Sequence, residues 1–208
     1  MRASTAPELP VEPAVAALVR GEGAASRPPP RVRWRRSASL GTASAGRLEG
    51  GVVLPPWGAD HATWDPVLRR SPGRAWRRVG SDRLVRLVLA VAGAFRREHP
   101  DAPRLLVGDL SRPHGGDFGP RFGGLGHVSH ENGLDADVYY PRRDRLERPP
   151  RRPAQVDLRL SQWLVDRFVA AGAVRVFVGP SLALRGRMDV VAQLPQHDNH
   201  LHVRIAAE

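Results

Sequence analysis

The spacing of hydrophobic residues predicts two long helices. After Ser81 the apolar side chains recur every three or four positions, which is the period of a helix that buries one face, and the pattern stops before Pro100. Serine at its start is a residue type that favours the capping position. The same period follows Asp157 and stops at Gly172, where a glycine suits the conformation that often closes a helix. We therefore expect two amphipathic helices.

Other segments have the shorter period of strands. Polar and apolar residues alternate at residues 134–140 and 200–205, so each of these strands has one polar and one apolar face. Apolar runs at residues 105–107, 174–178 and 189–192 predict further short strands. The polar faces carry Asp135 and Asp137 on the first alternating strand and His200, His202 and Arg204 on the second. The elements predict an α+β fold, in which a small, mainly antiparallel sheet carries the polar faces and is flanked by the two helices.

Composition divides the chain near residue 50. Residues 1–50 are rich in arginine, proline and alanine and have little periodic hydrophobicity, so we expect a disordered or loosely packed lead. Residues 51–208 hold the predicted elements and are expected to form one domain. Within it, the arginines and prolines of residues 141–153 favour a solvated loop over a contact with an anionic polymer. No apolar run approaches the ~20 residues of a transmembrane segment, and the N-terminus has no convincing secretion signal.

The charged residues are strongly unbalanced. The chain has 32 basic and 21 acidic residues, a formal net charge of +11, and every basic residue is arginine. The absence of lysine is typical of a GC-rich genome, so the charge is weak evidence of function, although it favours anionic partners such as nucleic acid or the bacterial wall. Nucleic acid is not expected, because the chain has no recognisable binding motif and no basic segment interleaved with aromatic residues. The chain has no cysteine, which excludes disulfides.

The two polar strand faces hold the residues of a candidate metal site. His130 precedes the first strand on a glycine-containing turn, and the second strand begins with His200 and His202. Two imidazoles and one carboxylate leave a coordination position of zinc open for water, which a hydrolytic site needs and a structural site lacks. The pattern therefore indicates a metallohydrolase. Spacing alone leaves open that these are unrelated polar residues on half-exposed strands.

Five short motifs follow one another in a set order along residues 51–206. They are Gly108-Asp109, Gly115-Gly116, Gly126-His127-Val128-Ser129-His130, Gly133-Leu134-Asp135-Ala136-Asp137 and His197-Asp198-Asn199-His200-Leu201-His202-Val203-Arg204. In this order they resemble the penicillin-insensitive murein endopeptidases, which belong to the wider LAS metallopeptidases. A single His-x-His is weak evidence, whereas the whole ordered set is specific.

The resemblance implies a LAS-type core in which His130, Asp137 and His202 hold a zinc ion (Zn2+). It also implies an endopeptidase that cuts the peptide cross-links of peptidoglycan, typically the D-alanyl to diaminopimelyl bond. The anionic partner is then peptidoglycan, and the protein is expected in the cell envelope or secreted. The positions that are polar and close to the metal in such enzymes match His127, Asp135, His197 and His200.

Asn199 occupies the position at which several LAS carboxypeptidases have a glutamate base. An amide does not accept a proton at neutral pH, so another group must be the base. We expect His197 or His200 to take this role and later to protonate the leaving amine, because histidine titrates near neutrality. The other histidine is expected to stabilise the oxyanion, and the sequence does not assign the two roles.

Further polar residues are expected around the ligands. Asp135 faces Arg204 if the two alternating strands pair, which favours a structural ion pair over a ligand role for Asp135. The sequence leaves open whether His127 orients a ligand or a substrate group, or has no role. Asp109 is expected to hydrogen-bond to the glycine loop or to a histidine near the metal.

The sequence leaves three other functions open. A LAS-type D-Ala-D-Ala carboxypeptidase or dipeptidase would act on free D-alanyl peptides, and Asn199 in place of glutamate counts against it. A non-catalytic zinc-containing wall-binding module would need no titratable groups beside the ligands, and His197 and His200 count against it. A basic nucleic-acid binder would show salt-dependent DNA affinity that survives chelation.

Overall fold

The chain is built around one six-stranded sheet. The computed structural model describes residues 28–119 and 127–207. The strand order in this sheet is β4-β6-β7-β10-β8-β9. The bounds are β4 (His61–Thr63), β6 (Leu105–Val107), β7 (Asp135–Tyr139), β10 (His200–Ile205), β8 (Ala173–Val178) and β9 (Val191–Gln193). The three central pairings are antiparallel and the two edge pairings are parallel, so the sheet is mixed and the fold is α+β.

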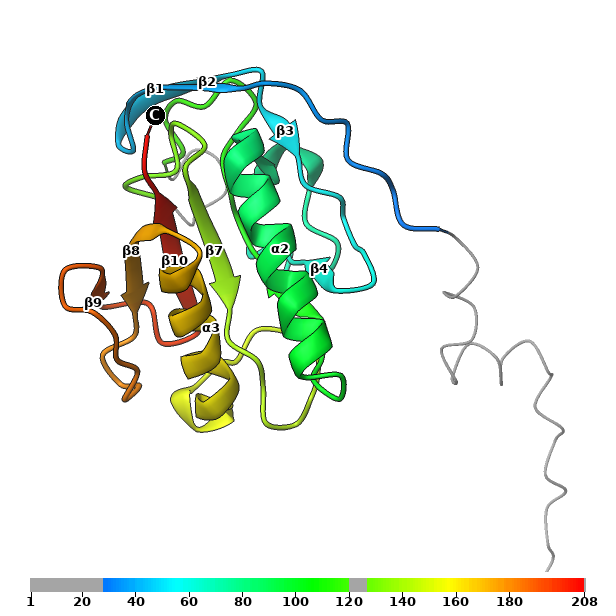
Figure 1. Ribbon diagram of the computed structural model, residues 1–208, viewed down its shortest axis with the longest axis vertical. Coiled ribbons are helices and arrows are strands. Elements are labelled where there is room, and N and C mark those ends of the chain that lie inside the picture. Colours follow the sequence, from blue (N-terminus) through cyan, green and yellow to red (C-terminus); the bar gives the residue numbers. More distant parts are fainter. Residues whose placement is uncertain (1–27, 120–126, 208) are drawn as a thin grey trace, which may run out of the picture.

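Two helices cover one face of this sheet (Figure 1). They are α2 (Asp82–Glu98) and α3 (Leu158–Ala170), close to the predicted segments. The side chains of Ser81 and Asp157 accept hydrogen bonds from backbone N–H groups of the first turn, which confirms the predicted cap at Ser81 and shows a cap of the same kind at Asp157. Caps of this kind each contribute about 1 kcal/mol to stability. Among the described residues, no helix has the length and apolar character needed to cross a membrane.

The alternation of β7 and β10 separates an apolar face from a polar one. The core that these strands share with the helices includes Val138, Leu201 and Val203. The two strands pair antiparallel, with His202 opposite Asp137 and Arg204 opposite Asp135. Because a slip by one residue would turn every side chain to the other face, burial of the apolar face maintains this register. The same register brings the polar residues together on the face that the helices do not cover.

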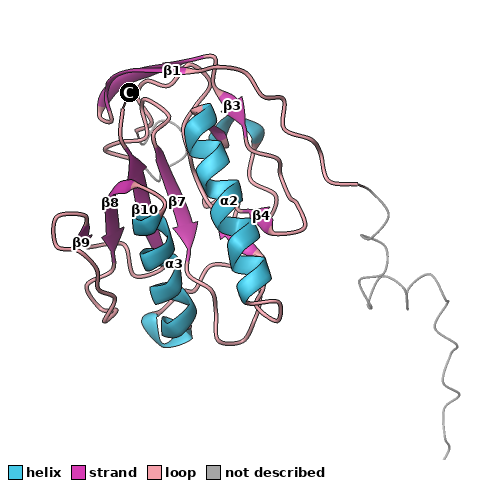
Figure 2. Cartoon of the chain, viewed as in Figure 1, coloured by secondary structure: helices cyan, strands magenta, loops and turns pink. Residues whose placement is uncertain are grey.

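A hairpin and a short strand pair lie outside the large sheet (Figure 2). They consist of β1 (Ala38–Thr42) with β2 (Ala45–Glu49), and of β3 (Val52–Val53) with β5 (Val79–Gly80). Leu48 of the hairpin is buried, so packed structure begins before residue 51, within the segment expected to be a disordered or loose lead. The hairpin buries few side chains besides Leu48, which explains its weak hydrophobic pattern. Residues 1–27 of the expected lead lie outside the described residues.

The arginine-rich loop of residues 141–153 is mostly exposed, as its composition predicted. It leads into a 3-10 helix, η4 (Pro153–Gln155). Among the arginines of this loop Arg142 is the exception, because its side chain is buried. Its guanidinium pairs with Asp144, and its Nη1 donates to Gln155 Oε1 at 3.1 Å. Arg142 therefore stabilises the conformation of the loop by contacts within it, and its side chain is not solvated.

Candidate active site

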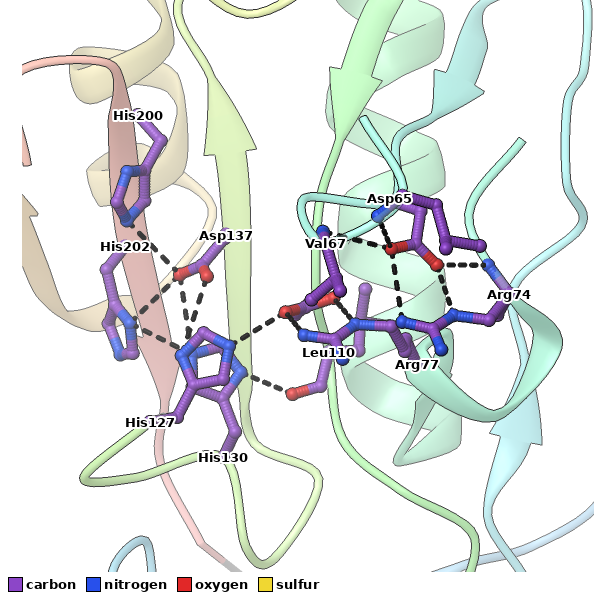
Figure 3. Close-up of polar contacts among 12 residues, drawn as sticks. Asp65, Val67, Arg74, Arg77, Leu110, His127, His130, Asp137, His200 and His202 are labelled. Carbon is purple, nitrogen blue, oxygen red and sulfur yellow. Dashed lines mark hydrogen bonds and ion pairs between the residues drawn. The ribbon is translucent and has the colours of Figure 1, made fainter. Parts of the chain in front are cut away.

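His130, Asp137 and His202 meet on the polar face of the central strands (Figure 3). Asp137 on β7 lies opposite His202 on β10, and His130 lies in the loop before β7. Asp137 Oδ1 is 3.3 Å from His130 Nε2 and 3.2 Å from His202 Nδ1. The two ring nitrogens are 3.2 Å apart. The structure thus brings together the three residues expected to be ligands, and all three are buried.

The second nitrogen of each of these imidazoles is held by an oxygen. His130 Nδ1 hydrogen-bonds to the backbone carbonyl of Leu110, and His202 Nε2 lies 2.8 Å from Asp135 Oδ1. A carbonyl and an ionised carboxylate only accept hydrogen bonds, so these two nitrogens carry the hydrogens. When the two rings are neutral, His130 Nε2 and His202 Nδ1 therefore carry the lone pairs, and both nitrogens face Asp137. Histidine ligands of metals are commonly held in this way.

The atoms that face one another fit a zinc ion. Tetrahedral zinc with bonds of about 2.0–2.1 Å separates neighbouring ligand atoms by about 3.3 Å. The three separations in the structure are 3.2, 3.2 and 3.3 Å. Two lone pairs and a carboxylate would repel one another at these distances, and either a proton on His202 or a metal ion removes this repulsion. The kind, number and spacing of the donors are therefore compatible with a bound metal ion.

His127 is a further neighbour of Asp137. His127, His130 and Asp137 offer ligand atoms that all lie within 4.8 Å of one another. However, His127 Nδ1 is 3.8 Å from Asp137 Oδ2, and its Nε2 lies 2.8 Å from Asp109 Oδ2. Its ring lies beside that of His130, with the centroids 4.2 Å apart. The shorter and more uniform separations favour His202 over His127 as the third ligand.

The carboxylates of the site are held in their charged form. Burial raises the pKa of Asp137, but the neighbouring imidazoles of His130 and His200 lower it well below its ordinary value. Burial also raises the pKa of Asp135, yet the hydrogen bond from His202 and nearby positive charges lower it to about 2. Burial lowers the pKa of His202, whereas hydrogen bonds to Asp135 and Asp137 raise it to about 9. The cluster therefore attracts positive charge.

Asp135 orients other residues of the site. Its own oxygens are not among the three atoms of His130, Asp137 and His202 that face one another. Arg204 Nε donates to Asp135 Oδ1 at 2.6 Å, which confirms the predicted cross-strand pair. The same oxygen accepts the hydrogen bond from His202, and Asp135 Oδ2 accepts the backbone N–H of His130 at 3.2 Å. One carboxylate thus orients one imidazole directly and the other through its backbone.

His200 and His197 lie next to this cluster. His200 Nε2 is 3.7 Å from Asp137 Oδ1, and its Nδ1 lies 2.6 Å from Asn199 Oδ1. Burial lowers the pKa of His200 to about 4, despite the opposing attraction of Asp137. The ring of His197 is 4.7 Å from that of His200, and its Nδ1 lies 2.9 Å from the carbonyl of Pro195. His200 is therefore a neutral imidazole beside Asp137, and both His200 and His197 are half-buried.

The turn that carries His197 is fastened by Asp198, a role that the sequence did not indicate. Asp198 Oδ1 accepts the backbone N–H of Ser181 at 3.0 Å, and Oδ2 accepts its hydroxyl at 2.7 Å. A Cβ at Gly179 would lie 2.2 Å from Asp198 Oδ1, so this close approach requires glycine. These contacts tie the turn to the end of β8.

Arg77 is the main site residue that the sequence analysis missed. It ends the 3-10 helix η2 (Ala75–Arg77) and forms a buried ion pair with Asp109. Asp109 in turn hydrogen-bonds to His127, which confirms one of the two contacts expected for it. Residues 74–78 contain three arginines, and nothing in their spacing tells which one is buried behind the site.

Comparison with known proteins identifies the family. The model of a family described as penicillin-insensitive murein endopeptidase matches residues 39–167, more than half of the 208-residue chain. The chain belongs to this family. The part matched to the murein endopeptidases includes His127, His130 and Asp137 and ends before His197. The resemblance drawn from the ordered motifs is thereby confirmed.

A curated relative carries the same description. The penicillin-insensitive murein endopeptidase of Haemophilus influenzae is 24% identical to this chain over 196 residues. The match covers 82% of this chain and 64% of the relative. The chain thus spans less than two thirds of the length of that murein endopeptidase.

Proposed function

We propose that this protein is a zinc-dependent endopeptidase that hydrolyses the peptide cross-links of bacterial peptidoglycan. The observation that carries the proposal is the set of 3.2–3.3 Å separations among His130, Asp137 and His202. Membership of the murein endopeptidase family supports the substrate class. Within that class we propose the D-alanyl to diaminopimelyl bond as the one that is cut.

The proposed activity resides in a LAS-type core made by residues 51–208 together with the hairpin β1–β2. One face of the central strands packs on the helices, and the other carries the candidate ligands, which supports such a core. A peptidoglycan hydrolase must reach the wall, so we propose that the protein acts in the cell envelope or after secretion.

His130, Asp137 and His202 would hold the metal. Bound zinc supplies a Lewis acid that polarises the scissile carbonyl and lowers the pKa of water. The contribution of the chain is to hold both imidazoles in the required orientation, through Asp135 and the carbonyl of Leu110. Neither ring then has to rotate for its lone pair to meet the ion.

His200 is the proposed general base. Asn199 holds its Nδ1, so Nε2 is left with the lone pair that lies 3.7 Å from Asp137. Nε2 accepts a proton from the attacking water as the water oxygen bonds to the carbonyl carbon. It returns the proton to the amide nitrogen as the C–N bond breaks. Asn199 thus orients the base and does not itself accept the proton. His197 is proposed to stabilise the oxyanion.

Digestion of purified muropeptide dimers tests this function. The zinc-loaded protein is expected to convert dimers into monomers, and chelator-treated protein is expected to leave them intact until zinc is restored. His202→Ala should be inactive, whereas His114→Ala, which changes an exposed histidine, should retain activity. Cleavage of D-Ala-D-Ala dipeptide instead of dimers would indicate a carboxypeptidase. Zinc binding without either product would indicate a non-catalytic module, and either result would overturn the proposal.

A further inference from the structure

Arg77 and Asp109 form an ion pair behind His127. Arg77 Nε donates to Asp109 Oδ1 at 2.7 Å and Nη2 donates to Oδ2 at 2.6 Å, with both side chains 1% exposed. Removing two charges from water is costly, and the cost is offset only when the pair has good geometry. A planar guanidinium that meets both carboxylate oxygens provides that geometry. A lysine at this position could not reproduce it.

Aromatic rings border the guanidinium of Arg77. Its Cζ is 4.9 Å from the ring centre of Trp76 and 5.0 Å from that of Phe118. Phe118 also contacts the rings of His127 and His130, with centroid distances of 4.9 and 6.2 Å. The position of Arg77 is therefore coupled to that of His127 by packing through Phe118 as well as through Asp109.

The carboxylate of Asp109 determines which nitrogen of His127 faces the site. Asp109 Oδ2 lies 2.6 Å from Arg77 Nη2 and 2.8 Å from His127 Nε2. An ionised carboxylate has no hydrogen to donate, so Nε2 of His127 must carry one. The other nitrogen, Nδ1, is then the one directed at Asp137, 3.8 Å from its Oδ2.

We propose that Arg77 is a positioning residue for His127, an inference that rests on the proposed peptidase function. Its two hydrogen bonds hold Asp109 as the acceptor of His127 Nε2. They also prevent the Asp109 carboxylate from turning toward the metal ligands. His127 consequently keeps Nδ1 directed at Asp137, on the side of the proposed metal ligands. Arg77 acts through Asp109 and Phe118 and is not itself catalytic.

A second ion pair on the same segment provides a matched control, and Figure 3 labels its residues Arg74 and Asp65 together with Arg77. Arg74 Nε donates to Asp65 Oδ2 at 2.5 Å, and the Cζ of Arg74 also lies 4.9 Å from the Trp76 ring centre. Asp65 additionally accepts the backbone N–H groups of Val67 and Leu68. This pair thus fastens a loop, whereas the Arg77 pair leads to a histidine of the site.

The experiment compares Arg77→Met with Arg74→Met in the zinc-loaded full chain. Arg77→Met is expected to lower kcat on muropeptide dimers about 10²-fold, while KM and zinc content stay within about threefold of wild type. Arg74→Met is expected to leave kcat within about threefold, because its loop contacts only support the fold. Thermal melting of each variant gives the folded fraction, to which kcat is normalised.

Arg77→Lys covers the case in which Arg77→Met does not fold. It keeps the charge beside Asp109 but loses the paired hydrogen bonds, so we expect kcat to fall about tenfold, whereas Arg74→Lys should not lower it. If the folded Arg77→Met variant kept kcat within about threefold of wild type, Arg77 would have only a structural role. An unchanged kcat in Arg77→Lys would overturn the proposal in the same way.

Proton–nitrogen NMR correlations of the His127 ring provide a readout that does not depend on activity. In wild type we expect a hydrogen on Nε2 and none on Nδ1, and in Asp109→Asn we expect the hydrogen to move to Nδ1, because the amide then donates to Nε2. A wild-type ring with its hydrogen on Nδ1 alone would refute the positioning role. Wild-type protein that cleaves no muropeptide would instead refute the proposed function, while the ring spectrum of Arg77→Lys, expected to lose the fixed hydrogen on Nε2, would still test Arg77.

Discussion

Four imidazoles lie around the carboxylate of Asp137. His130 and His202 are nearest, at 3.3 and 3.2 Å, and His200 and His127 follow at 3.7 and 3.8 Å. They differ in what holds their second ring nitrogen: a backbone carbonyl for His130, a carboxylate for His202 and for His127, and an amide for His200. Because that partner fixes the hydrogen of each ring, it also determines which nitrogen is free for chemistry. The proposed roles follow from these partners more than from the histidines alone.

The variant His200→Ala tests the proposed base. We expect kcat on muropeptide dimers to fall about 10²–10⁴-fold, because positioned proton transfer is lost while the three ligands remain. Zinc content, measured by elemental analysis, should stay at the wild-type level. His114→Ala serves as the control for removal of a histidine. Full turnover in His200→Ala would exclude it as the base, and loss of zinc would assign it to the ligands.

Asp135→Ala tests the residue that orients His202. Without the carboxylate, the His202 ring is free to rotate and to bind its hydrogen on either nitrogen, so we expect zinc affinity to fall about 10–100-fold. Competition with a chromophoric chelator measures this affinity. Asp189→Ala is the matched control, because its carboxylate pairs with Arg187 on the surface. Equal affinities in the two variants would contradict the orienting role.

The contacts of some of these residues could be predicted from the sequence, and those of others could not. The pairing of Asp135 with Arg204 follows from strand alternation and from one assumption about neighbouring strands. Arg77 was not predictable, because its partner Asp109 is 32 residues away and its burial depends on Phe118 from yet another loop. The choice between His200 and His197 also needed the position of the Asn199 side chain, which no spacing contains.

At the scale of elements, the turn before β7 determines where His130 lies. His130 and Gly133 both have positive φ, 72° and 74°. A positive φ costs a residue other than glycine roughly 1–3 kcal/mol, so the surroundings must maintain it. The hairpin β1–β2 contributes, because Glu131 accepts the backbone N–H of Gly46 at 3.1 Å and donates its own N–H to Ala43 at 3.0 Å. An element outside the large sheet thus supports a candidate ligand.

Gly133→Ala tests this support, with Gly172→Ala as its control. Both glycines have positive φ, but a Cβ at Gly133 would lie 2.6 Å from Leu48 Cδ2, whereas one at Gly172 would meet nothing within 4 Å. We expect Gly172→Ala to lower the free energy of unfolding by about 1 kcal/mol and Gly133→Ala by about 3 kcal/mol, since overpacking adds to the backbone strain. Urea unfolding measures both values. Similar losses in the two variants would show that the close packing of Leu48 on Gly133 adds nothing to the strain of the turn.

At the scale of the whole molecule, the helices and strands with a clear hydrophobic period could be predicted from the sequence. The edge strand β4 and the hairpin β1–β2 could not. Helices α2 and α3 and strands β7 and β10 follow from their hydrophobic periods, because each buries one complete face. Strand β4 has three residues and pairs parallel with β6, so its place depends on contacts distant in sequence and not on its own pattern. The hairpin was missed for a similar reason, because Leu48 gains its burial from other parts of the fold.

Zinc is expected to stabilise the entire domain, because its proposed ligands come from the loop of His130 and from two different strands. A ligand that binds only the folded state adds about 2.7 kcal/mol at a free concentration 100 times its Kd. For a chain of this size, that corresponds to a rise in Tm of roughly 5–10 °C. Scanning calorimetry of chelator-stripped and zinc-reloaded protein measures it. Asp189→Ala should show the wild-type rise, and His202→Ala should show little of it. Equal melting temperatures of the stripped and reloaded wild type at saturating zinc would contradict a metal site that joins these strands.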